Sequence, residues 1–355
     1  MRRQNIMNPK QLAQQIKENI MNHELTIYHE SEVGDPDFWY PANEMEYLLT
    51  DQLAGYNLDG FALRTRSKIV KSQVCEALGY PVPKSFKKTQ PRFLCQKFDV
   101  YTQKSNNLQI WNEEISPSRR YVLIRISEDD IITKIKVVTG DVLAKLDTTG
   151  KLTQKYQARY SHAHKEPAVL LSNDTEFINN ITQEYNIFDK FTSPTSDPKE
   201  DELMPIELIF DKLKNIVGKT IPYIGATQER NRGGHLHKLI CEALGYSYFK
   251  DNGDFPDVKH QLLEVKLQTS QTIDLGLFLP SDEEPLDIPQ LNHQPIHMCD
   301  VRYAIFFGDV INNQIIIKHF YLVNGQDFFT YFTQFGGKKI NKKLQIPLPA
   351  TFWNE

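Results

Sequence analysis

The chain has 355 residues, of which 40% are hydrophobic and 24% are charged, a composition typical of a globular protein that is long enough for two domains. Its formal net charge of −4 excludes a uniformly basic nucleic-acid coat but permits a local basic groove. The four cysteines form no CxxC pair, and no apolar run suits a signal peptide or a membrane span. We therefore expect a soluble cytoplasmic protein without a disulfide framework or a zinc knuckle.

The first 44 residues form an extension before the first expected domain. They contain the helical stretch MNPKQLAQQIKENI and the aromatic run FWYP, and the sequence assigns them no role. The domain that follows is expected over residues 45–160. Its clearest element is a helix that begins near Arg66 and stops at Gly79, a glycine placed as a C-terminal cap.

That helix ends in CEALGY, at residues 75–80, and the same six residues recur at 241–246. The match extends in both directions: RSKIVKSQVCEALGY faces RGGHLHKLICEALGY without a gap, and residues 91–111 face residues 256–276. The strand-like segments RRYVLIRI and VRYAIFFG follow in the same order. Such self-similarity indicates two tandem copies of one α/β domain. Two unrelated amphipathic helices that share the common LG stop are the simpler alternative.

Residues 161–203 separate the two copies. The segment ends in TSPTSDPKEDE, which is rich in proline, serine and acidic residues, so we expect a solvated linker. The second copy is expected over residues 204–355.

The two copies differ at three aligned positions that bear on chemistry. The second copy has Asp257, Glu264 and Lys266, where the first has Arg92, Asp99 and Tyr101. Glu264 and Lys266 are two residues apart on an expected strand and share a face, which Asp257 can reach from the preceding segment. Two carboxylates can hold Mg²⁺ against a phosphate oxygen and a water, while the lysine steadies the nucleophile or the developing charge. An exposed charged strand would give the same pattern without any catalytic role.

The first copy lacks this chemistry. A fixed positive charge at Arg92 would repel a divalent cation, and Tyr101 cannot replace an ammonium group, so we expect only the second copy to cut. Arg92 and the paired Lys87 and Lys88 are expected to contact phosphates instead.

With these residues in view, the run RGGHLHKLICEALGYSYFKDNGDFPDVKHQLLEVKLQTS resembles the PD-(D/E)xK nucleases, in particular the MutH-like branch of the restriction-endonuclease folds. The resemblance covers most of the second copy, and the first only through the internal repeat. It implies an α/β protein of two tandem restriction-endonuclease-like domains, each a mixed central sheet flanked by helices. It further implies a type II restriction endonuclease that uses Mg²⁺ to hydrolyse double-stranded DNA at specific sites, leaving 5′-phosphate ends.

The resemblance also assigns roles to individual residues. Asp257 and Glu264 would be the metal ligands, and Lys266 would orient or help deprotonate the attacking water. Glu242 would match the family's helical glutamate and complete the metal shell. The lysine-rich segment KKINKKLQIPLP would bring Lys342 and Lys343 to the DNA backbone, with Lys155 in the corresponding run of the first copy. A solvated charged face is the ordinary interpretation of such runs.

Two other functions fit the same residues. One active lobe per chain would cut one strand, so a MutH-like strand-nicking repair endonuclease is possible, and double-strand cleavage requires a homodimer or two successive events. A non-catalytic DNA-binding regulatory protein would carry the pattern as a vestige. His235 and His237 point about 200° apart on their helix, so we expect surface or DNA-facing side chains rather than a joint metal site. Gln268 either holds a group beside Lys266 or is an ordinary strand residue.

Overall fold

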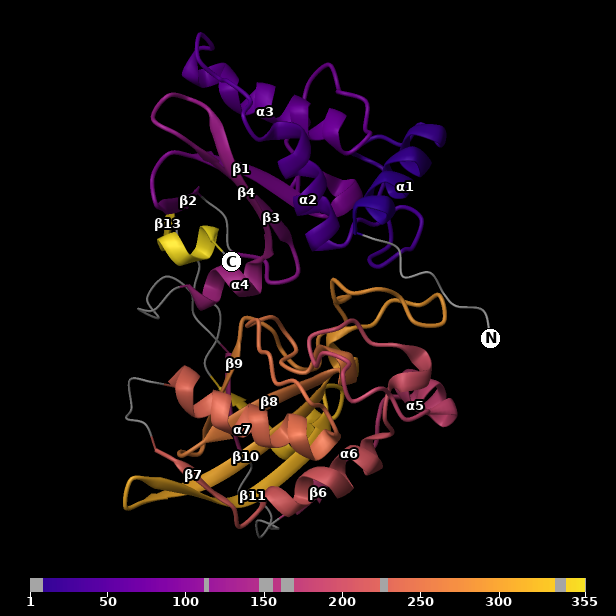
Figure 1. Cartoon of the computed structure of the whole chain (residues 1–355), viewed down its shortest axis with the longest axis vertical. Coiled ribbons are helices and arrows are strands. Elements are labelled where there is room, and N and C mark those ends of the chain that lie inside the picture. Colours follow the sequence, from indigo (N-terminus) through magenta and orange to yellow (C-terminus); the bar gives the residue numbers. More distant parts are fainter. Residues whose placement is uncertain are drawn as a thin grey trace. The chain divides into compact units, whose positions relative to one another are not determined.

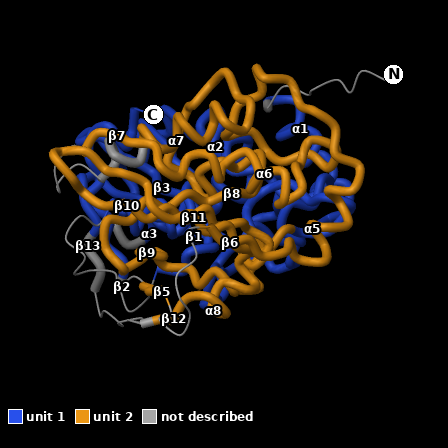
Figure 2. Tube along the Cα trace, turned by 90° about the horizontal axis from the view of Figure 1, so that it is seen from below, with its two compact units in different colours: residues 1–153, 286–295, 339–355 blue, residues 154–285, 296–338 orange. Residues whose placement is uncertain are grey.

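The structure is a computed structural model that describes residues 9–111, 115–146, 156–160, 169–223, 229–335 and 343–354. The chain divides into two compact units (Figure 2): unit 1 is Met1–Thr153, Leu286–Pro295 and Lys339–Glu355, and unit 2 is Gln154–Pro285 and Ile296–Lys338. Each combines helices with β-sheet, as expected for an α/β protein, but neither is one uninterrupted stretch of chain. Within the described ranges no helix has the length and apolar character that a membrane crossing requires.

Unit 1 begins with three helices, α1 (Pro9–Asn22), α2 (Ala42–Leu53) and α3 (Leu63–Ala77). Its main sheet has the order β1-β3-β4, formed by β1 (Phe98–Gln103), β3 (Arg120–Ile126) and β4 (Ile132–Thr139). β1 is parallel to β3, and β3 is antiparallel to β4. A second sheet pairs β2 (Asn107–Trp111) with β13 (Lys343–Pro347), and two short helices are α4 (Gly140–Lys145) and the 3-10 helix η7 (Ala350–Trp353).

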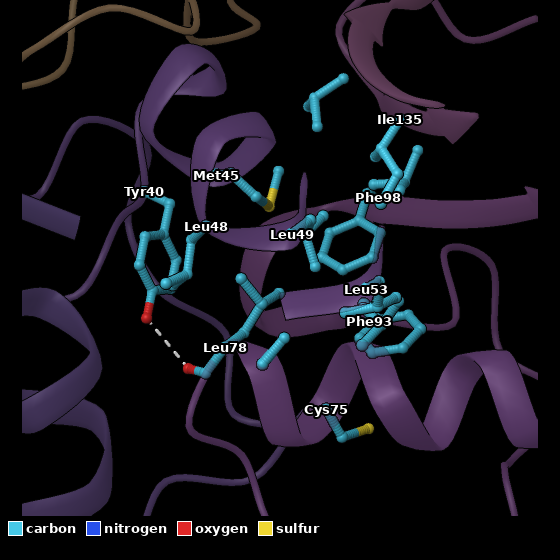
Figure 3. Packing of buried hydrophobic residues seen from close by; sticks show 14 of the residues in the cluster. Tyr40, Met45, Leu48, Leu49, Leu53, Cys75, Leu78, Phe93, Phe98 and Ile135 are labelled. Atoms are coloured by element: carbon cyan, nitrogen blue, oxygen red, sulfur yellow. Dashed lines mark hydrogen bonds between the residues drawn. The ribbon is translucent and has the colours of Figure 1, made fainter. Parts of the chain in front are cut away.

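The core of unit 1 lies between these helices and the main sheet (Figure 3). Tyr40 is fully buried there, and its hydroxyl donates a hydrogen bond to the carbonyl of Leu78 at 2.9 Å. Ala13, Ile16 and Ile20 of α1 belong to the same core. The amino-terminal extension is therefore an integral part of unit 1, a role that its sequence did not indicate.

Unit 2 is built on the sheet β6-β11-β10-β8, with β7 paired to β11 (Figure 1). Its strands are β6 (Val169–Leu171), β7 (Thr220–Pro222), β8 (Leu263–Gln268), β10 (Arg302–Ile311) and β11 (Gln314–Asn324). β8 is parallel to β10, and β10 is antiparallel to β11. A second sheet has the order β12-β5-β9, from β5 (Tyr156–Tyr160), β9 (Thr272–Gly276) and β12 (Phe332–Phe335). The described helices are α5 (Glu176–Ile181), α6 (Ile206–Leu213), α7 (Glu229–Leu244) and α8 (Phe328–Tyr331).

Alternate residues of β8 face two environments. Leu263, Val265 and Leu267 pack into the core that α6 and α7 cover, and Figure 1 shows α7 lying across this sheet. Because side chains alternate along a strand, Glu264 and Lys266 point to the opposite face. The side chains expected to do chemistry therefore lie on the face of the sheet away from α7.

Residues 169–203, within the expected linker, are folded into unit 2. They form β6 and α5 and supply Asp174, whose carboxylate makes a bidentate ion pair with Arg302, both N–O distances being 2.7 Å. The side chains are 2% and 0% exposed, and a charge buried this deeply requires its partner.

The proline- and acid-rich stretch itself contacts the 3-10 helix η5 (Lys259–Gln261). The Pro194 carbonyl accepts from the N–H of His260 at 3.0 Å, and Asp197 pairs with Lys259 at 2.9 Å. The stretch is therefore a loop of unit 2 rather than a free tether.

The two aligned segments adopt the same local structure. Each begins at a cis X–Pro bond and passes through a 3-10 helix, η1 (Leu94–Gln96) in unit 1 and η5 (Lys259–Gln261) in unit 2. The next residue is left-handed in both, with φ of 48° at Lys97 and 49° at Leu262, and the strand begins directly after it. Each strand is parallel to a second strand that opens with a fully buried arginine, Arg120 or Arg302.

The last strand of each copy pairs within the other unit. β5 belongs to the first copy in sequence yet lies antiparallel to β9 in unit 2, and β13 belongs to the second copy yet lies antiparallel to β2 in unit 1. β2 and β9 are equivalent in the alignment, and the registers agree, since Gln157 faces Asp274 and Gln345 faces Gln109. The two copies therefore exchange their carboxy-terminal strands.

Candidate active site

Glu264 and Lys266 form an ion pair on the face of β8 away from α7. Lys266 Nζ lies 2.6 Å from Glu264 Oε1, and the lysine and glutamate side chains are 24% and 7% exposed, respectively. The spacing of two along a strand accounts for the shared face. The carboxylate is held inside the protein surface, while the lysine reaches it from the side of the solvent.

Asp257 joins this pair through two backbone hydrogen bonds. Its own N–H donates to Glu264 Oε2 at 3.1 Å, and its Oδ2 accepts from the N–H of Val265 at 2.9 Å. These reciprocal bonds hold both carboxylates against one point of β8. We refer to Asp257, Glu264 and Lys266 as the carboxylate–lysine cluster.

The turn that enters β8 is anchored by the side chain of Gln261. Its amide oxygen accepts from the N–H of Met204 at 2.8 Å, and its amide nitrogen donates to the carbonyl of Glu202 at 2.9 Å. Its own carbonyl accepts from Arg302 Nη1 at 3.1 Å. Gln96 makes the same three kinds of bond in unit 1. These bonds fix the left-handed residue after the 3-10 helix and thus the direction in which the strand leaves it.

The cluster offers two carboxylates to a cation. Within the described residues, no group of three or more histidine, cysteine, aspartate or glutamate side chains could hold a metal ion. Mg²⁺ does not require such a cage, because it keeps several waters and is usually bound by one or two carboxylates together with substrate phosphates. Asp257 and Glu264 therefore suit a hydrated Mg²⁺ more than they suit a fully protein-ligated metal.

Glu242 is not brought together with the cluster into such a group. Its side chain is 48% exposed on α7, and its carboxylate lies 3.7 Å from Lys238 Nζ, four residues earlier on the same helix. α7 covers the face of the sheet opposite to Glu264, which explains the separation. The expectation that Glu242 completes the metal shell gains no support from this arrangement.

The equivalent place in unit 1 keeps one carboxylate and adds a fixed cation. The N–H of Arg92 donates to Asp99 Oδ1 at 3.1 Å, just as Asp257 donates to Glu264 in unit 2. Asp99 Oδ2 lies 3.4 Å from Arg119 Nη1, with both side chains nearly buried. A guanidinium therefore lies beside the carboxylate of unit 1, where unit 2 has a second carboxylate and a lysine.

Tyr101, the counterpart of Lys266, brings an aromatic ring to this position. Its ring stacks on Tyr121 with the centroids 5.8 Å apart, and Arg119 donates from Nη2 to the Tyr121 hydroxyl at 2.8 Å. An aromatic and guanidinium packing arrangement thus replaces the flexible ammonium group of unit 2.

The residues expected to contact DNA in unit 1 lie near this position. Lys87 and Lys88 are exposed, and Arg92 is half-buried, its Nη1 donating to the carbonyl of Lys87 at 2.9 Å. Burial, and then the charge of Arg92, lowers the pKa of the Lys71 ammonium group on α3. Positive charge therefore gathers here. Of the other three expected DNA contacts, Lys155 and Lys342 fall outside the described residues, and Lys343 is described only as the start of β13.

The two histidines of α7 lie in different environments. His235 is exposed, as expected, but His237 is 5% exposed and its Nε2 lies 3.4 Å from Cys241 Sγ. His237 is therefore buried rather than on the surface, where it lies close to Cys241 of the same helix and to Lys250 and Asp251 of the segment that follows α7. Burial raises the pKa of the Cys241 thiol to about 12, which makes it a packing residue rather than a nucleophile.

Gln261 and Arg119 also belong to these two places, and neither belongs to the residues expected there from the sequence. The glutamine carried a signal, since it stands three residues before the acidic residue in both copies, as Gln96 does before Asp99. Arg119 carried none, because its counterpart is Val301 and its pairing with Asp99 joins two different strands.

No protein-family model matches the chain, and no curated protein or solved structure is significantly similar to it. The function has to be inferred from the residues themselves.

Proposed function

We propose that unit 2 is a Mg²⁺-dependent phosphodiesterase acting on double-stranded DNA, and that the chain is a type II restriction endonuclease of the PD-(D/E)xK kind. One observation carries the proposal: two carboxylates and an ammonium group converge on a single point of an edge strand. The internal comparison supports it. The matching place in unit 1 has the same turn and strand, but a guanidinium fills the position next to its carboxylate.

Each residue of the cluster has a role that follows from its position. Asp257 and Glu264 would bind Mg²⁺, which supplies polarisation of a phosphate oxygen and a lowered pKa for a bound water. Lys266 Nζ, 2.6 Å from Glu264 Oε1, is placed to donate a hydrogen bond to the attacking water or to the phosphate. Its 24% exposure allows it to turn from the carboxylate toward a substrate.

Unit 1 would bind DNA without cutting it. Lys87 and Lys88 are exposed lysines beside Arg92, and cations of this kind contact phosphates without reading sequence. Their contribution would be electrostatic and would weaken as salt increases.

One carboxylate–lysine cluster per chain would cut one strand at a time. Cleavage of both strands would then need a second chain bound to the same DNA, or a second event by the first. A nicked plasmid that becomes linear only slowly, with no dependence on protein concentration, would favour the strand-nicking repair endonuclease instead.

Digestion of a phage genome and a supercoiled plasmid by the purified chain tests the proposal. We expect discrete fragments with Mg²⁺ and none with EDTA, and we expect the Lys266→Ala chain to give none in either condition. DNA that is bound in a gel-shift assay but never cut, whether methylated or not, would identify a non-catalytic DNA-binding protein and would overturn the proposal.

A further inference from the structure

A pocket of about 200 Å³ lies in unit 2 at the carboxy-terminal end of β8, and no residue of the carboxylate–lysine cluster lines it. Gln268, which lines it, is two residues beyond Lys266 on the same face of β8, so their Cα atoms are about 7 Å apart. At this level of the sheet Gln268 pairs with Phe307 of β10, which pairs with His319 of β11. The pocket thus continues the catalytic face by one side-chain spacing along the strand.

One wall of the pocket is aromatic. Tyr321 is 1% exposed, and its ring centroid lies 5.2 Å from that of Tyr160 and 6.2 Å from that of His319, with interplanar angles of 13° and 23°. The three nearly parallel rings, which we call the aromatic wall, are joined by Phe307 at 5.7 Å from Tyr321. Apart from Gly308, the remaining residues that line the pocket are polar or charged and form what we call its polar rim: Gln268, Thr269, Ser270, Gln271, Asp309 and Lys318.

A β-bulge shapes the pocket. Phe307 pairs with His319, but the next residue, Gly308, pairs with Ile317, so Lys318 is the extra residue of β11. A bulge of this kind bends its strand and re-aims the side chains next to it. Lys318 and His319, which would otherwise point to opposite faces, consequently both line the pocket.

Unit 1 has a bulge at the same place, after Arg125, so the pocket positions can be matched between the copies. Arg125 is at the position equivalent to Phe307, and Lys134 is at the position equivalent to His319. Beside these residues the chain places its own Trp353, from η7: the Arg125 guanidinium lies 5.8 Å from the indole centroid, and Lys134 Nζ donates to the Trp353 carbonyl at 3.0 Å. Trp353 is 3% exposed. The matching position thus accommodates a planar bicyclic ring.

We propose that the pocket receives one nucleobase of the DNA substrate, unstacked from its neighbours and laid against the aromatic wall. The inference rests on the proposed function, because the phosphate next to that base would lie at the carboxylate–lysine cluster. Stacking on aromatic rings accepts any base, since every base has a π-face, and the polar rim can bond to the edge of the base. A purine has the two-ring outline of the indole that unit 1 places at the matching position.

Filling the pocket tests this inference. In Thr269→Trp, a large ring is introduced at an exposed position that lines the pocket, where it can fill the pocket. Glu207→Trp is the matched control, since it adds the same ring at an exposed position of α6, on the opposite face of the sheet. His319→Ala is the second test variant and removes one ring of the wall. Circular dichroism of the four whole chains verifies that each is folded.

The first measurement is saturation-transfer NMR with the four deoxynucleoside 5′-monophosphates, which requires no cleavage. We expect transfer to the base protons with the wild-type and Glu207→Trp chains, and its loss with Thr269→Trp. Inorganic phosphate at the same concentration should not abolish it. If saturation transfer to the base protons is absent in the wild-type chain, or is unchanged in Thr269→Trp, the pocket does not bind a nucleobase.

The second measurement uses DNA. We expect Thr269→Trp and His319→Ala to lower kcat/KM roughly ten- to hundredfold relative to Glu207→Trp, as expected for the loss of base stacking. Permanganate and chloroacetaldehyde react with unstacked bases. In DNA bound by the non-cleaving Lys266→Ala chain, they should modify a base next to the phosphodiester bond that the wild-type chain cleaves. If the DNA is cleaved but the two variants keep the kcat/KM of Glu207→Trp and no base is modified, the inference about the pocket is wrong and the proposed function is unaffected. No cleavage, together with nucleotide binding that Thr269→Trp removes, supports the pocket and overturns the proposed function.

Discussion

Lys266 Nζ lies 2.6 Å from Glu264 Oε1, whereas Asp99, the counterpart of Glu264, is 3.4 Å from Arg119 Nη1. Both copies thus give their buried acidic residue a cation. In unit 1 the cation is a guanidinium that is 7% exposed and tied to a tyrosine, and in unit 2 it is a lysine that is 24% exposed. On the proposed function, the more exposed lysine of unit 2 could turn away to admit a metal and a phosphate, whereas the guanidinium of unit 1 is held in place by its tyrosine.

Replacing Lys266 by alanine should abolish cleavage and leave DNA binding nearly intact. General acid–base and electrostatic help from one positioned group is worth roughly 10²- to 10⁴-fold in rate. The rate of plasmid nicking and the Kd from fluorescence anisotropy measure the two properties separately. Lys238→Ala, on the exposed side of α7, is the control and should leave both near the wild-type values. A Lys266→Ala chain that cuts at the wild-type rate would remove this lysine from the mechanism.

The basic residues of unit 1 should appear in the salt dependence of binding. Removing the cation that neutralises one phosphate should reduce the slope of log Kobs against log salt by about 0.9. We expect Lys87→Ala, Lys88→Ala and Arg92→Ala each to flatten the slope in the Lys266→Ala background, with little change in sequence preference. Lys214→Ala, at an exposed ion pair of η4 (Lys214–Ile216) next to α6, should leave it unchanged. Equal slopes in all four chains would exclude unit 1 as the DNA contact.

Much of this site was visible in the sequence, because the aligned segments differ at Asp257, Glu264 and Lys266 while their surroundings match. The spacing of Glu264 and Lys266 is enough to place both on one face of a strand. The position of Glu242 could not be read in this way, since the side of α7 that meets the sheet depends on packing between distant elements. The sequence also carried no indication that β5 pairs with β9 and that β13 pairs with β2. Both copies contain similar strands, and no local feature of a strand indicates which copy it joins.

Breaking the buried ion pair of Asp174 and Arg302 should strongly destabilise unit 2, because it leaves one buried charge without its partner. Asp174→Asn leaves the Arg302 charge, which is 0% exposed, without a charged partner, and should lower the free energy of unfolding by about 3–5 kcal/mol. Asp211→Asn breaks an equally short pair whose side chains are 62% and 45% exposed, and should cost less than about 1 kcal/mol. Urea unfolding compares the two. Equal losses would show that Asp174 is dispensable.

Acid should destabilise unit 2 through two buried histidines. Burial lowers the pKa of His237, against the opposing charge of Asp251, and it lowers the pKa of His260, against the hydrogen bond with Glu202. The folded state therefore binds fewer protons than the unfolded state, so stability is full above about pH 6.5 and is lost as the pH falls below it. Each histidine contributes a slope of at most about 1.4 kcal/mol per pH unit.

Urea unfolding between pH 7.5 and pH 5.5 measures this slope. His237→Gln and His260→Gln should each flatten it relative to the wild-type chain, and His235→Gln, at an exposed position, should not. A wild-type slope that persists in both variants would place the titrating group elsewhere.

The expected catalytic lobe, residues 204–355, should not fold by itself. It lacks β5 and β6, which complete two sheets of unit 2, and it carries β13, whose partner β2 belongs to unit 1. We expect a fragment of these residues to be insoluble or to lack a cooperative thermal transition, whereas the whole chain has one. A fragment that begins at residue 154 should be better folded, and a stable, active fragment of residues 204–355 would contradict the exchange of strands.

The same exchange has a consequence for a single copy of the repeat. A protein with only one copy of this repeat would have one terminal strand equivalent to β5 and β13, and one partner strand equivalent to β2 and β9. Two such chains could exchange their last strands, which gives the single-copy form a route to a domain-swapped dimer. Within this single polypeptide, the same exchange takes place between the two copies of one chain.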